Sequence, residues 1–359
     1  MKYFNFIVAI LLTILYAIGK IPPSEKYNLW LIPFLIPFAL AANILFLIIS
    51  LILRKKSSIY FIVTLVIGSN YLLGTVGLKH FFSDQEFTPE TFGVLSYNIN
   101  AGLGLTAPLS DVTGTDSTVD LGAWILHQEA AIQCYQEFMY RKNGESDLIG
   151  MLNRKGVHTY FSHDHIEPED ERYVVGTLIV SKFPIVKSGD VLASDNGFNR
   201  IAYADIKLPK DTIRIVNLHL ESMGLKVFHP GNTSGFQSRK ENAKIIFSKL
   251  KEGVFERSEQ IKTLGEFIES TPHAVICVGD FNELPYSYSY QFMKRRMKNA
   301  FEEVGKGFGF TYNGKTLRAL RIDNQFYSSG VSAVKFSTRD DVRFSDHFPI
   351  EGTYKIDLP

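Results

Sequence analysis

Three apolar segments without a charged residue dominate the first 80 residues of the chain. They cover residues 4–18, 29–53 and 58–78. The second and third have the roughly 20 residues that a membrane-spanning α-helix needs, whereas the first is of marginal length. Because a run without any charge is hard to reconcile with an amphipathic surface helix, a buried bundle in a soluble protein is the less favoured alternative. We therefore predict a membrane anchor of about three transmembrane helices in residues 1–80.

The first segment has a second interpretation, since the core of a signal peptide has a similar length. No clear small-x-small cleavage site follows residues 4–18, and two further apolar segments do, so we favour a span. The loop RKKSS at residues 54–58 carries three positive charges, and such loops stay in the cytoplasm. With three spans the chain leaves on the other side. We expect the remaining residues to face the periplasm or the cell exterior.

The charge of the chain divides at the same place. The sequence has 38 Lys and Arg against 37 Asp and Glu, a formal net charge of +1. Residues 1–80 contain seven of these bases and a single acid, Glu25, which gives them +6. The rest of the chain keeps 31 bases and 36 acids, a net charge of −5. Since nucleic acid is held mainly through Lys and Arg, this balance disfavours tight nucleic-acid binding, although a local basic groove could lie within the acidic part.

After a polar linker at residues 81–91, strand-like and helix-like patterns alternate to the end of the chain. Runs rich in β-branched and aromatic residues predict strands at 92–100, 131–138, 174–185, 201–208, 212–220, 273–282, 318–328 and 348–356. Apolar residues at helical spacing predict helices at 118–129, 238–252, 254–270 and 287–303. This pattern indicates one α+β domain at 92–359, in which two sheets pack face to face between helices.

Polar residues interrupt the apolar runs at several predicted strand ends. They are Asn98, Glu137, His219, Asp280, Asn282, Asp323, Asp346 and His347. A buried carboxylate costs several kcal/mol unless it is paired or binds a metal, so their recurrence indicates that they converge on one site. Carboxylate and amide oxygens suit a hard divalent cation such as Mg²⁺, and no Cys or His cluster has zinc spacing. The residues alone predict a metal-dependent hydrolase.

The motifs around these residues resemble those of the endonuclease/exonuclease/phosphatase superfamily. In chain order they are SYNIN, QE, GTLIVSKFPI, NLHLES, GDFNELP, RIDNQFYS and SDHFPI, and the resemblance covers essentially all of residues 91–357. The combination of GDFN and SDH, with QE upstream and RID between them, is the specific part of the pattern. The resemblance implies a DNase I-like four-layer α/β-β/α sandwich and a phosphoester substrate.

The resemblance also implies a metal site. Glu137 is similar to the principal Mg²⁺ ligand of the superfamily, supported by Asn98 and, directly or through water, by Asp346. Mn²⁺ and Ca²⁺ are the alternative ions. Asn98 as the polar cap of a strand, and the two acids as solvated loop residues, are the simpler interpretations of each residue taken alone.

Five further residues match the catalytic positions of the superfamily. His347 is similar to the residue that handles the proton of the attacking water, and Asp323 to the one that orients its imidazole. Asp280 and Asn282 would position the nucleophile and the phosphoryl oxygens. His219 would stabilise the charge that develops on the phosphate or assist the leaving group.

These features together predict a membrane-anchored, Mg²⁺-dependent phosphodiesterase or phosphatase with the bilayer and a phosphoester as its partners. An outward-facing site would meet lipid head groups, sugar phosphates or nucleotides, so we favour small or lipid-linked substrates. An extracytoplasmic nuclease acting on DNA or RNA is the alternative. A membrane-anchored binding protein without catalysis is a further alternative, which the complete set of site residues disfavours. The long loop at 222–239, next to His219, is expected to shape the substrate pocket or to touch the bilayer.

Overall fold

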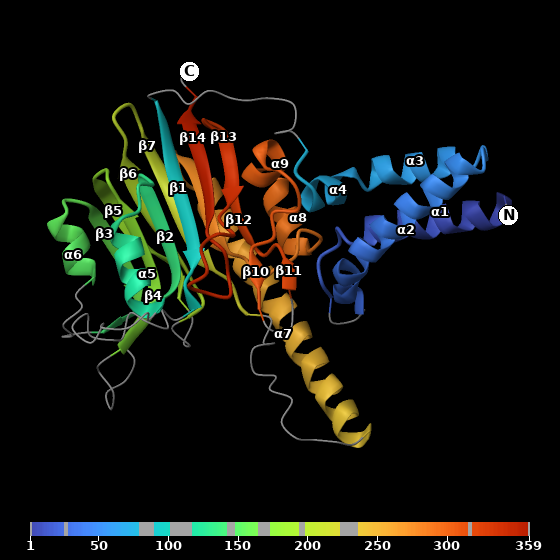
Figure 1. The fold of residues 1–359 in the computed structure, drawn as a ribbon, viewed down its shortest axis with the longest axis horizontal. Coiled ribbons are helices and arrows are strands. Elements are labelled where there is room, and N and C mark those ends of the chain that lie inside the picture. Colours follow the sequence, from blue (N-terminus) through green and yellow to red (C-terminus); the bar gives the residue numbers. More distant parts are fainter. Residues whose placement is uncertain are drawn as a thin grey trace.

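The computed structural model describes two parts of the chain that lie against each other. The described residues are 2–24, 28–78, 90–100, 117–141, 148–163, 173–193, 198–222, 236–314 and 318–357. The first part, residues 2–78, is called the helical unit below. The second part, residues 90–357, is a sandwich of two β-sheets with helices on its outer faces, and because it contains all eight residues of the predicted site we refer to it by its predicted role, as the catalytic domain (Figure 1).

The first sheet of the catalytic domain has six strands in the order β13-β14-β1-β2-β4-β3. In that order their bounds are Val331–Thr338, Ile350–Ile356, Thr91–Asn98, Ile132–Arg141, Tyr173–Ser181 and His158–His163. Only β1 and β2 run parallel, with Asn98 opposite Gln136, while the other neighbours are antiparallel. The carboxyl ends of β1 and β2 therefore meet at one end of the sandwich.

The second sheet also has six strands, in the order β5-β6-β7-β8-β12-β9. Their bounds are Ile185–Ala193, Arg200–Lys207, Thr212–His219, Ala274–Asp280, Asp323–Tyr327 and Lys298–Asn299. The central strands β7 and β8 are parallel, so that His219 lies opposite Asp280, and the antiparallel strand β12 brings Asp323 opposite Asp280 from its other side. A separate two-stranded sheet is formed by β10 (Tyr312–Asn313) and β11 (Arg318–Leu320).

The two sheets enclose one apolar core, and each carries helices on its outer face. Side chains such as Val94 and Ile132 from the first sheet meet Ile215 and Ile276 from the second. The outer face of the first sheet packs against α5 (Ser117–Leu126) and α6 (Leu148–Arg154). That of the second packs against α7 (Phe236–Glu269) and α8 (Tyr288–Lys294). The prediction of an α+β two-sheet sandwich is confirmed.

Several predicted elements differ in extent. The helices expected at 238–252 and 254–270 form the single 34-residue helix α7, because one internal Gly costs only about 1 kcal/mol in a helix. The helix expected at 287–303 is divided into α8, β9 and α9 (Ala300–Val304), and the strand at 318–328 into β11 and β12. Among the unpredicted strands, β3, β5 and β13 lie at sheet edges. The residues of β3 and β5 are mostly exposed or half-buried, so their apolar pattern is weak.

The helical unit consists of α1 (Lys2–Ile18), the short 3₁₀ helix η1 (Asn28–Leu31), α2 (Ile32–Ile52), α3 (Ser58–Ile67) and α4 (Ser69–Thr75). Within the described part of the chain, one helix, Leu29–Ile52, is long and apolar enough to cross a membrane. The apolar helix α1 is shorter. The third apolar segment is not the continuous helix that we expected, since α3 and α4 meet at an angle of 71°. A Cβ atom added to Gly68, at this bend, would lie 2.7 Å from the ring of Tyr16.

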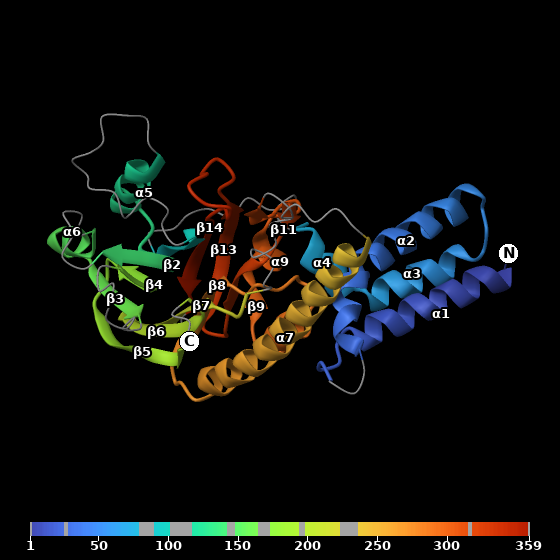
Figure 2. The same ribbon diagram turned by 90° about the horizontal axis from the view of Figure 1, so that it is seen from below.

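The helices α1, α2 and α3 run side by side and point away from the sandwich (Figures 1 and 2). Buried polar groups join them, for example the hydroxyl of Thr64, which donates to the side-chain carbonyl of Asn43 at 3.0 Å. Such polar contacts between helices are common where the surroundings are apolar. The N-terminus and the turn between α2 and α3 lie at the end of the bundle far from the catalytic domain (Figure 1).

The near end of the helical unit is fixed to the catalytic domain by backbone and side-chain hydrogen bonds. Gly77 and Gly307 exchange two of them, with N···O distances of 2.8 and 3.1 Å. The buried guanidinium of Arg321 donates to the carbonyl oxygen of Gly74. On another side of this interface the ring of Trp30 packs against that of Phe247 in α7, with 4.8 Å between the ring centroids. The catalytic domain is therefore held close to the helices and not suspended on a free linker.

Candidate active site

The predicted site residues meet at the end of the sandwich where the parallel strand pairs of both sheets stop. Asn98, the last residue of β1, is fully buried and connects the two sheets. Its amide nitrogen donates to Glu137 Oε1 at 3.2 Å and to Asp280 Oδ2 at 3.0 Å. One side chain from the first sheet thus holds carboxylates from both sheets together.

Glu137 reaches this position because β2 contains a bulge. The register between β2 and β4 shifts between Tyr135 and Phe138, and Glu137 has a φ of 50°. A β-bulge places two residues opposite one and changes the direction of a side chain that strict alternation would send to the other face. Here Gln136 points between the sheets, where its amide nitrogen donates to Asn217 Oδ1 at 2.7 Å. This hydrogen bond between the sheets supports the backbone that carries Glu137.

His219, at the end of β7, presents one ring nitrogen to both carboxylates. Its Nδ1 lies 2.9 Å from the carbonyl oxygen of Phe198, and since a carbonyl only accepts, Nδ1 carries the proton. Nε2 then lies 3.7 Å from Glu137 Oε1 and 3.7 Å from Asp280 Oδ2. A buried imidazole fixed in this orientation can donate to an anionic group between the carboxylates when it is protonated.

Asp280 and Asn282 form a tight turn directly after β8. The backbone N–H of Asn282 donates to Asp280 Oδ1 at 2.8 Å, and Asn282 has a φ of 49°, which Asn tolerates better than most residues. The amide nitrogen of Asn282 donates to the carbonyl oxygen of Leu220 at 3.0 Å. The buried ion pair between Arg257 Nε and Glu283 Oε1, at 2.7 Å, fixes the next residue of the turn to α7. The turn is therefore rigid on both sides of Asn282.

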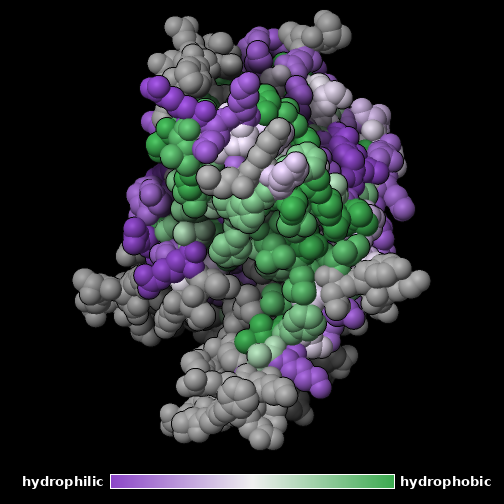
Figure 3. Space-filling model, turned by 90° about the vertical axis from the view of Figure 1, so that its right-hand side faces the viewer, coloured by the Kyte–Doolittle hydropathy of each residue, from purple (hydrophilic) through white to green (hydrophobic). Residues whose placement is uncertain are grey.

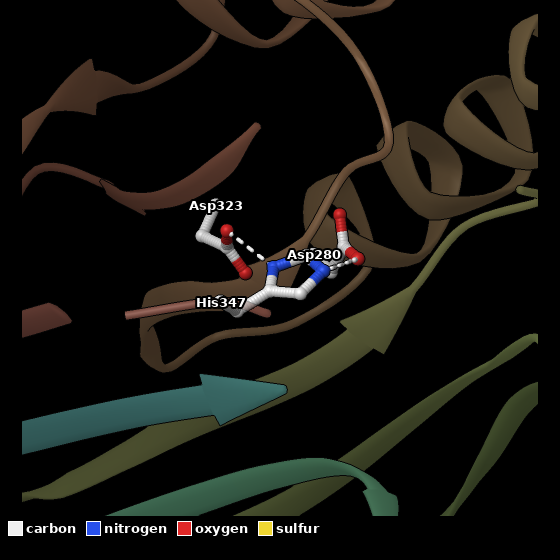
Figure 4. Close-up of side chains that lie close together, drawn as sticks. All are labelled: Asp280, Asp323 and His347. Carbon is white, nitrogen blue, oxygen red and sulfur yellow. Dashed lines mark hydrogen bonds and ion pairs between the residues drawn. The ribbon is translucent and has the colours of Figure 1, made fainter. Parts of the chain in front are cut away.

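His347 and Asp323 form the pair that the sequence predicted. His347 Nδ1 lies 2.9 Å from Asp323 Oδ2, while Nε2 lies 3.6 Å from Asp280 Oδ2 (Figure 4). The ring of Tyr312 packs edge-on against the imidazole, with 4.9 Å between the ring centroids. A carboxylate on Nδ1 fixes the tautomer and directs Nε2 toward the reacting groups.

Burial and neighbouring charges shift the pKa values of this pair. Burial raises the pKa of Asp323, and the charge of Asp280 acts in the same direction, whereas His347 opposes it. Burial by itself would lower the pKa of His347, but the charges of Asp323, Asp280 and Asp346 outweigh it and raise the pKa to about 9. A divalent cation bound among these carboxylates would lower the pKa of His347 again, because the two positive charges repel each other.

The donor set fits a hard divalent cation. Glu137, Asp280 and Asp323 are all buried, and such an excess of buried negative charge requires a compensating positive charge. One ligand atom each of Asp280, Asp323 and His347 lies within 4.8 Å of the others, so this triad could hold a metal ion. Carboxylate oxygens are the ligands that Mg²⁺, Mn²⁺ and Ca²⁺ prefer.

The predicted metal ligands, Asn98, Glu137 and Asp346, are not members of the buried triad that could hold a metal ion. Asn98 donates to Glu137 and Asp280, and its side-chain oxygen accepts from the backbone N–H of Asn100 at 3.0 Å. Asp346 is half-buried beside His347, and its carboxylate accepts a hydrogen bond from the Ser345 hydroxyl at 3.3 Å. The assignment of Asn98, Glu137 and Asp346 as the metal ligands stays a prediction. So do the roles assigned to His219, Asp280, Asn282, Asp323 and His347.

Sequence reasoning missed the residues that support the site. Asn217 donates to the carbonyl oxygens of Tyr135 and Leu178, both at 3.1 Å, in addition to its bond with Gln136. Its signal was present in the sequence, since Asn217 precedes His219 by two positions and therefore lies on the same face of β7. Tyr312 carried no such signal, because it contacts His347 only through the fold. Residues 223–235 of the loop expected to shape the pocket lie outside the described residues.

Comparison with solved structures agrees with the two-sheet sandwich. An endonuclease/exonuclease/phosphatase from Beutenbergia cavernae has 16% identity and a TM-score of 0.53, over 74% of this chain and 72% of that one. The catalytic domain of human Nocturnin has 14% identity and a TM-score of 0.52, over 78% of this chain and 98% of that one. At such identities the likeness concerns the fold alone. Comparison with curated protein sequences gives no match.

Two family models match separate parts of the chain. Residues 1–75, nearly all of the helical unit, match a domain of unknown function (DUF8431). Residues 95–347 match the endonuclease/exonuclease/phosphatase family, whose members are generally hydrolytic phosphoesterases and typically depend on a divalent metal. This second match covers well over half of the chain and contains all eight predicted site residues. The chain therefore belongs to the endonuclease/exonuclease/phosphatase family.

Proposed function

We propose that the protein is a membrane-anchored, divalent-metal-dependent phosphoester hydrolase that acts on small or lipid-linked phosphoesters. The main support for this proposal is the arrangement of side chains around Asp280. Asp280 Oδ2 accepts from Asn98 at 3.0 Å and lies 3.7 Å from His219 Nε2 and 3.6 Å from His347 Nε2. Phosphoryl transfer requires mainly positioning and neutralisation of charge, and this cluster provides groups for both.

The proposed mechanism assigns a separate task to each group. Glu137, with Asn98 and Asp346, would hold the cation, which when bound neutralises charge on the phosphoryl oxygens. His347, with Nδ1 engaged by Asp323, offers Nε2 to take the proton of the attacking water. Asp280 orients that water.

The leaving-group side of the proposed site belongs to two other residues. The side-chain amide of Asn282 donates one N–H to the carbonyl oxygen of Leu220 and would offer its second N–H to the phosphoryl oxygens. His219, whose Nδ1 is occupied by the Phe198 carbonyl, stabilises the negative charge that develops in the transition state.

The surface of the helical unit supports membrane anchoring. A broad apolar face covers the end of the molecule formed by α1, α2 and α3 (Figure 3). Its exposed side chains include Phe4, Ile7, Leu11, Phe38, Leu45, Ile52 and Val66. Contact of this apolar surface with water costs a free energy of about 25 cal/mol per Å², and lipid would remove that contact. A bilayer is therefore its proposed partner.

The direction of the helices supports an outward-facing catalytic domain. Arg54, Lys55 and Lys56 lie in the turn between α2 and α3, at the end of the bundle far from the sandwich. Since basic loops remain in the cytoplasm, the catalytic domain would lie on the periplasmic or extracellular side. There it would meet lipid head groups before chromosomal DNA, and extracytoplasmic DNA or RNA remains the alternative substrate.

A fusion experiment tests this topology. A reporter enzyme that is active only outside the cytoplasm is expected to be active when fused after Pro359 and inactive when fused at Ser57. Immunoblotting of both fusions provides the control for expression. The reverse pattern would place the active site in the cytoplasm and remove the reason for favouring lipid-linked substrates.

An activity screen tests the proposed reaction. The purified full chain in detergent is expected to hydrolyse bis-p-nitrophenyl phosphate or p-nitrophenyl phosphate with Mg²⁺, and EDTA is expected to stop the reaction until excess Mg²⁺ or Mn²⁺ is added. Sphingomyelin and plasmid DNA complete the substrate panel. Activity that persists in EDTA would contradict metal dependence, and activity on DNA alone would favour the nuclease.

A further inference from the structure

A groove with a volume of about 700 Å³ lies beside the candidate active site. Its described lining contains four exposed basic side chains and one acidic side chain, Asp340. The basic residues are Lys306, Arg318, Lys335 and Arg343. This excess of positive charge contrasts with the net charge of −5 of residues 81–359, so the catalytic domain concentrates basic residues here. We call this feature the basic groove.

A single side chain separates the basic groove from His347. Tyr312 lines the groove, and its ring packs against the imidazole of His347 with 4.9 Å between the ring centroids. The next residue, Asn313, also lines the groove, and its backbone N–H donates to the carbonyl oxygen of Asp346 at 2.8 Å. A ligand that occupies the basic groove would therefore lie one side chain away from the groups proposed to cleave the phosphoester.

The aromatic part of the basic groove lies next to the helical unit. Phe308 and Phe310 line it, are 54% and 41% exposed, and stack on each other with ring centroids 5.4 Å apart. Gly307, directly before Phe308, exchanges backbone hydrogen bonds with Gly77, which follows α4. Two exposed Phe rings beside the proposed membrane anchor form an apolar surface that lipid would cover. The basic groove thus borders both the helical unit and Tyr312, the residue that packs on His347.

We propose that the basic groove binds the head group of an anionic membrane lipid that carries a second phosphate beyond the scissile phosphoester. This inference rests on the proposed function and names its substrate class. Several basic side chains around one cavity complement a head group with more than one phosphate, since a single phosphate requires fewer of them. The apolar rim of Phe308 and Phe310 would face the lipid tails, because it continues from the helical unit.

Single-stranded nucleic acid is the other polyanion that basic and aromatic side chains bind. Two observations favour the lipid. Phe308 and Phe310 are stacked face to face, with an angle of 3° between their planes, so each ring has one face covered by the other. The aromatic part of the groove also borders the segment that connects directly to α4, where a bilayer would present a lipid.

The first experiment measures binding without catalysis. The full chain in detergent, kept in EDTA, is titrated with dioctanoyl phosphatidylinositol 4-phosphate, which carries two phosphates, and with zwitterionic dioctanoyl phosphatidylcholine. The Lys335→Gln/Arg343→Gln variant is expected to bind the two-phosphate lipid at least tenfold more weakly and to leave weak binding of the zwitterionic lipid unchanged. The matched control, Lys187→Gln/Lys207→Gln, removes two exposed charges from β5 and β6 and is expected to bind like the wild type.

Turnover then separates the basic groove from the catalytic site. The groove variant is expected to raise KM for the two-phosphate lipid while kcat and the hydrolysis of bis-p-nitrophenyl phosphate stay unchanged. Groove-dependent binding without any turnover would overturn the proposed function and support the groove. Unchanged lipid binding in the groove variant, or equal loss in the control, would overturn the groove proposal. So would selective loss of binding to a single-stranded oligonucleotide, which would assign the groove to nucleic acid.

Discussion

Replacing Glu137 by Gln is expected to lower Mg²⁺-dependent hydrolysis of bis-p-nitrophenyl phosphate by about 10³-fold or more while the protein stays folded. The substitution keeps the size of the side chain and can still accept from Asn98, which lies 3.2 Å away in the wild type. It removes the negative charge that would hold the cation, and a neutral amide is a much weaker ligand for Mg²⁺. The measurement is initial rate against Mg²⁺ concentration.

Glu259→Gln provides the matched control for this variant. Glu259 lies on α7 with a largely exposed side chain and pairs only with a neighbour on the same helix, Lys262, among the contacts described. Its replacement is expected to leave the rate and the Mg²⁺ dependence unchanged. If Glu137→Gln retained near wild-type turnover at low Mg²⁺, Glu137 would not be the principal ligand.

Replacing His347 by Gln is expected to reduce turnover by roughly 10²- to 10⁴-fold, the usual contribution of a general acid or base. Asp323→Asn is expected to cause a loss of similar order, because an amide oxygen no longer compensates an imidazolium charge on Nδ1, which lies 2.9 Å away in the wild type. The double variant is expected to be no slower than His347→Gln alone, since the two residues act as a unit.

The exposed His158, in the edge strand β3, provides the control, and His158→Gln is expected to be fully active. The informative comparison is the non-additivity of the pair. If the losses from Asp323→Asn and His347→Gln multiplied in the double variant, the residues would act independently. Asp323 would then belong to the metal site and not to the positioning of His347.

The sequence by itself determined the two-sheet sandwich, and it named the polar residues that the structure brings together at one end of it. Strands such as β1, β7 and β8 are buried for most of their length and are rich in apolar and β-branched residues, and each ends in a polar residue. Because parallel strands end at the same edge of a sheet, His219 and Asp280 could be expected to meet without any knowledge of the contacts. The apolar segment in α2 was equally clear, since it depends on composition alone.

Only the tertiary structure decided how the site residues are held. The bulge at Glu137 depends on a hydrogen bond between Gln136 and Asn217, which are 81 residues apart. The bend at Gly68 depends on the ring of Tyr16, which comes from another helix. Neither contact has a local sequence pattern, because each is formed between segments that only the fold brings together.

The basic groove is the clearest example of a feature that has no local sequence pattern. The sequence allowed a local basic groove within an acidic domain, but it could not locate one. Its basic residues, from Lys306 to Arg343, come from a loop, two strands and a turn, and none lies in a charged run long enough to mark a binding surface. Charge and hydropathy patterns report which residues are near in the chain, whereas a groove depends on which are near in space. Local patterns therefore determined the strands, their polar ends and the apolar helices, and long-range packing decided the orientation of Glu137, the broken third helix and the surface that we assign to the substrate.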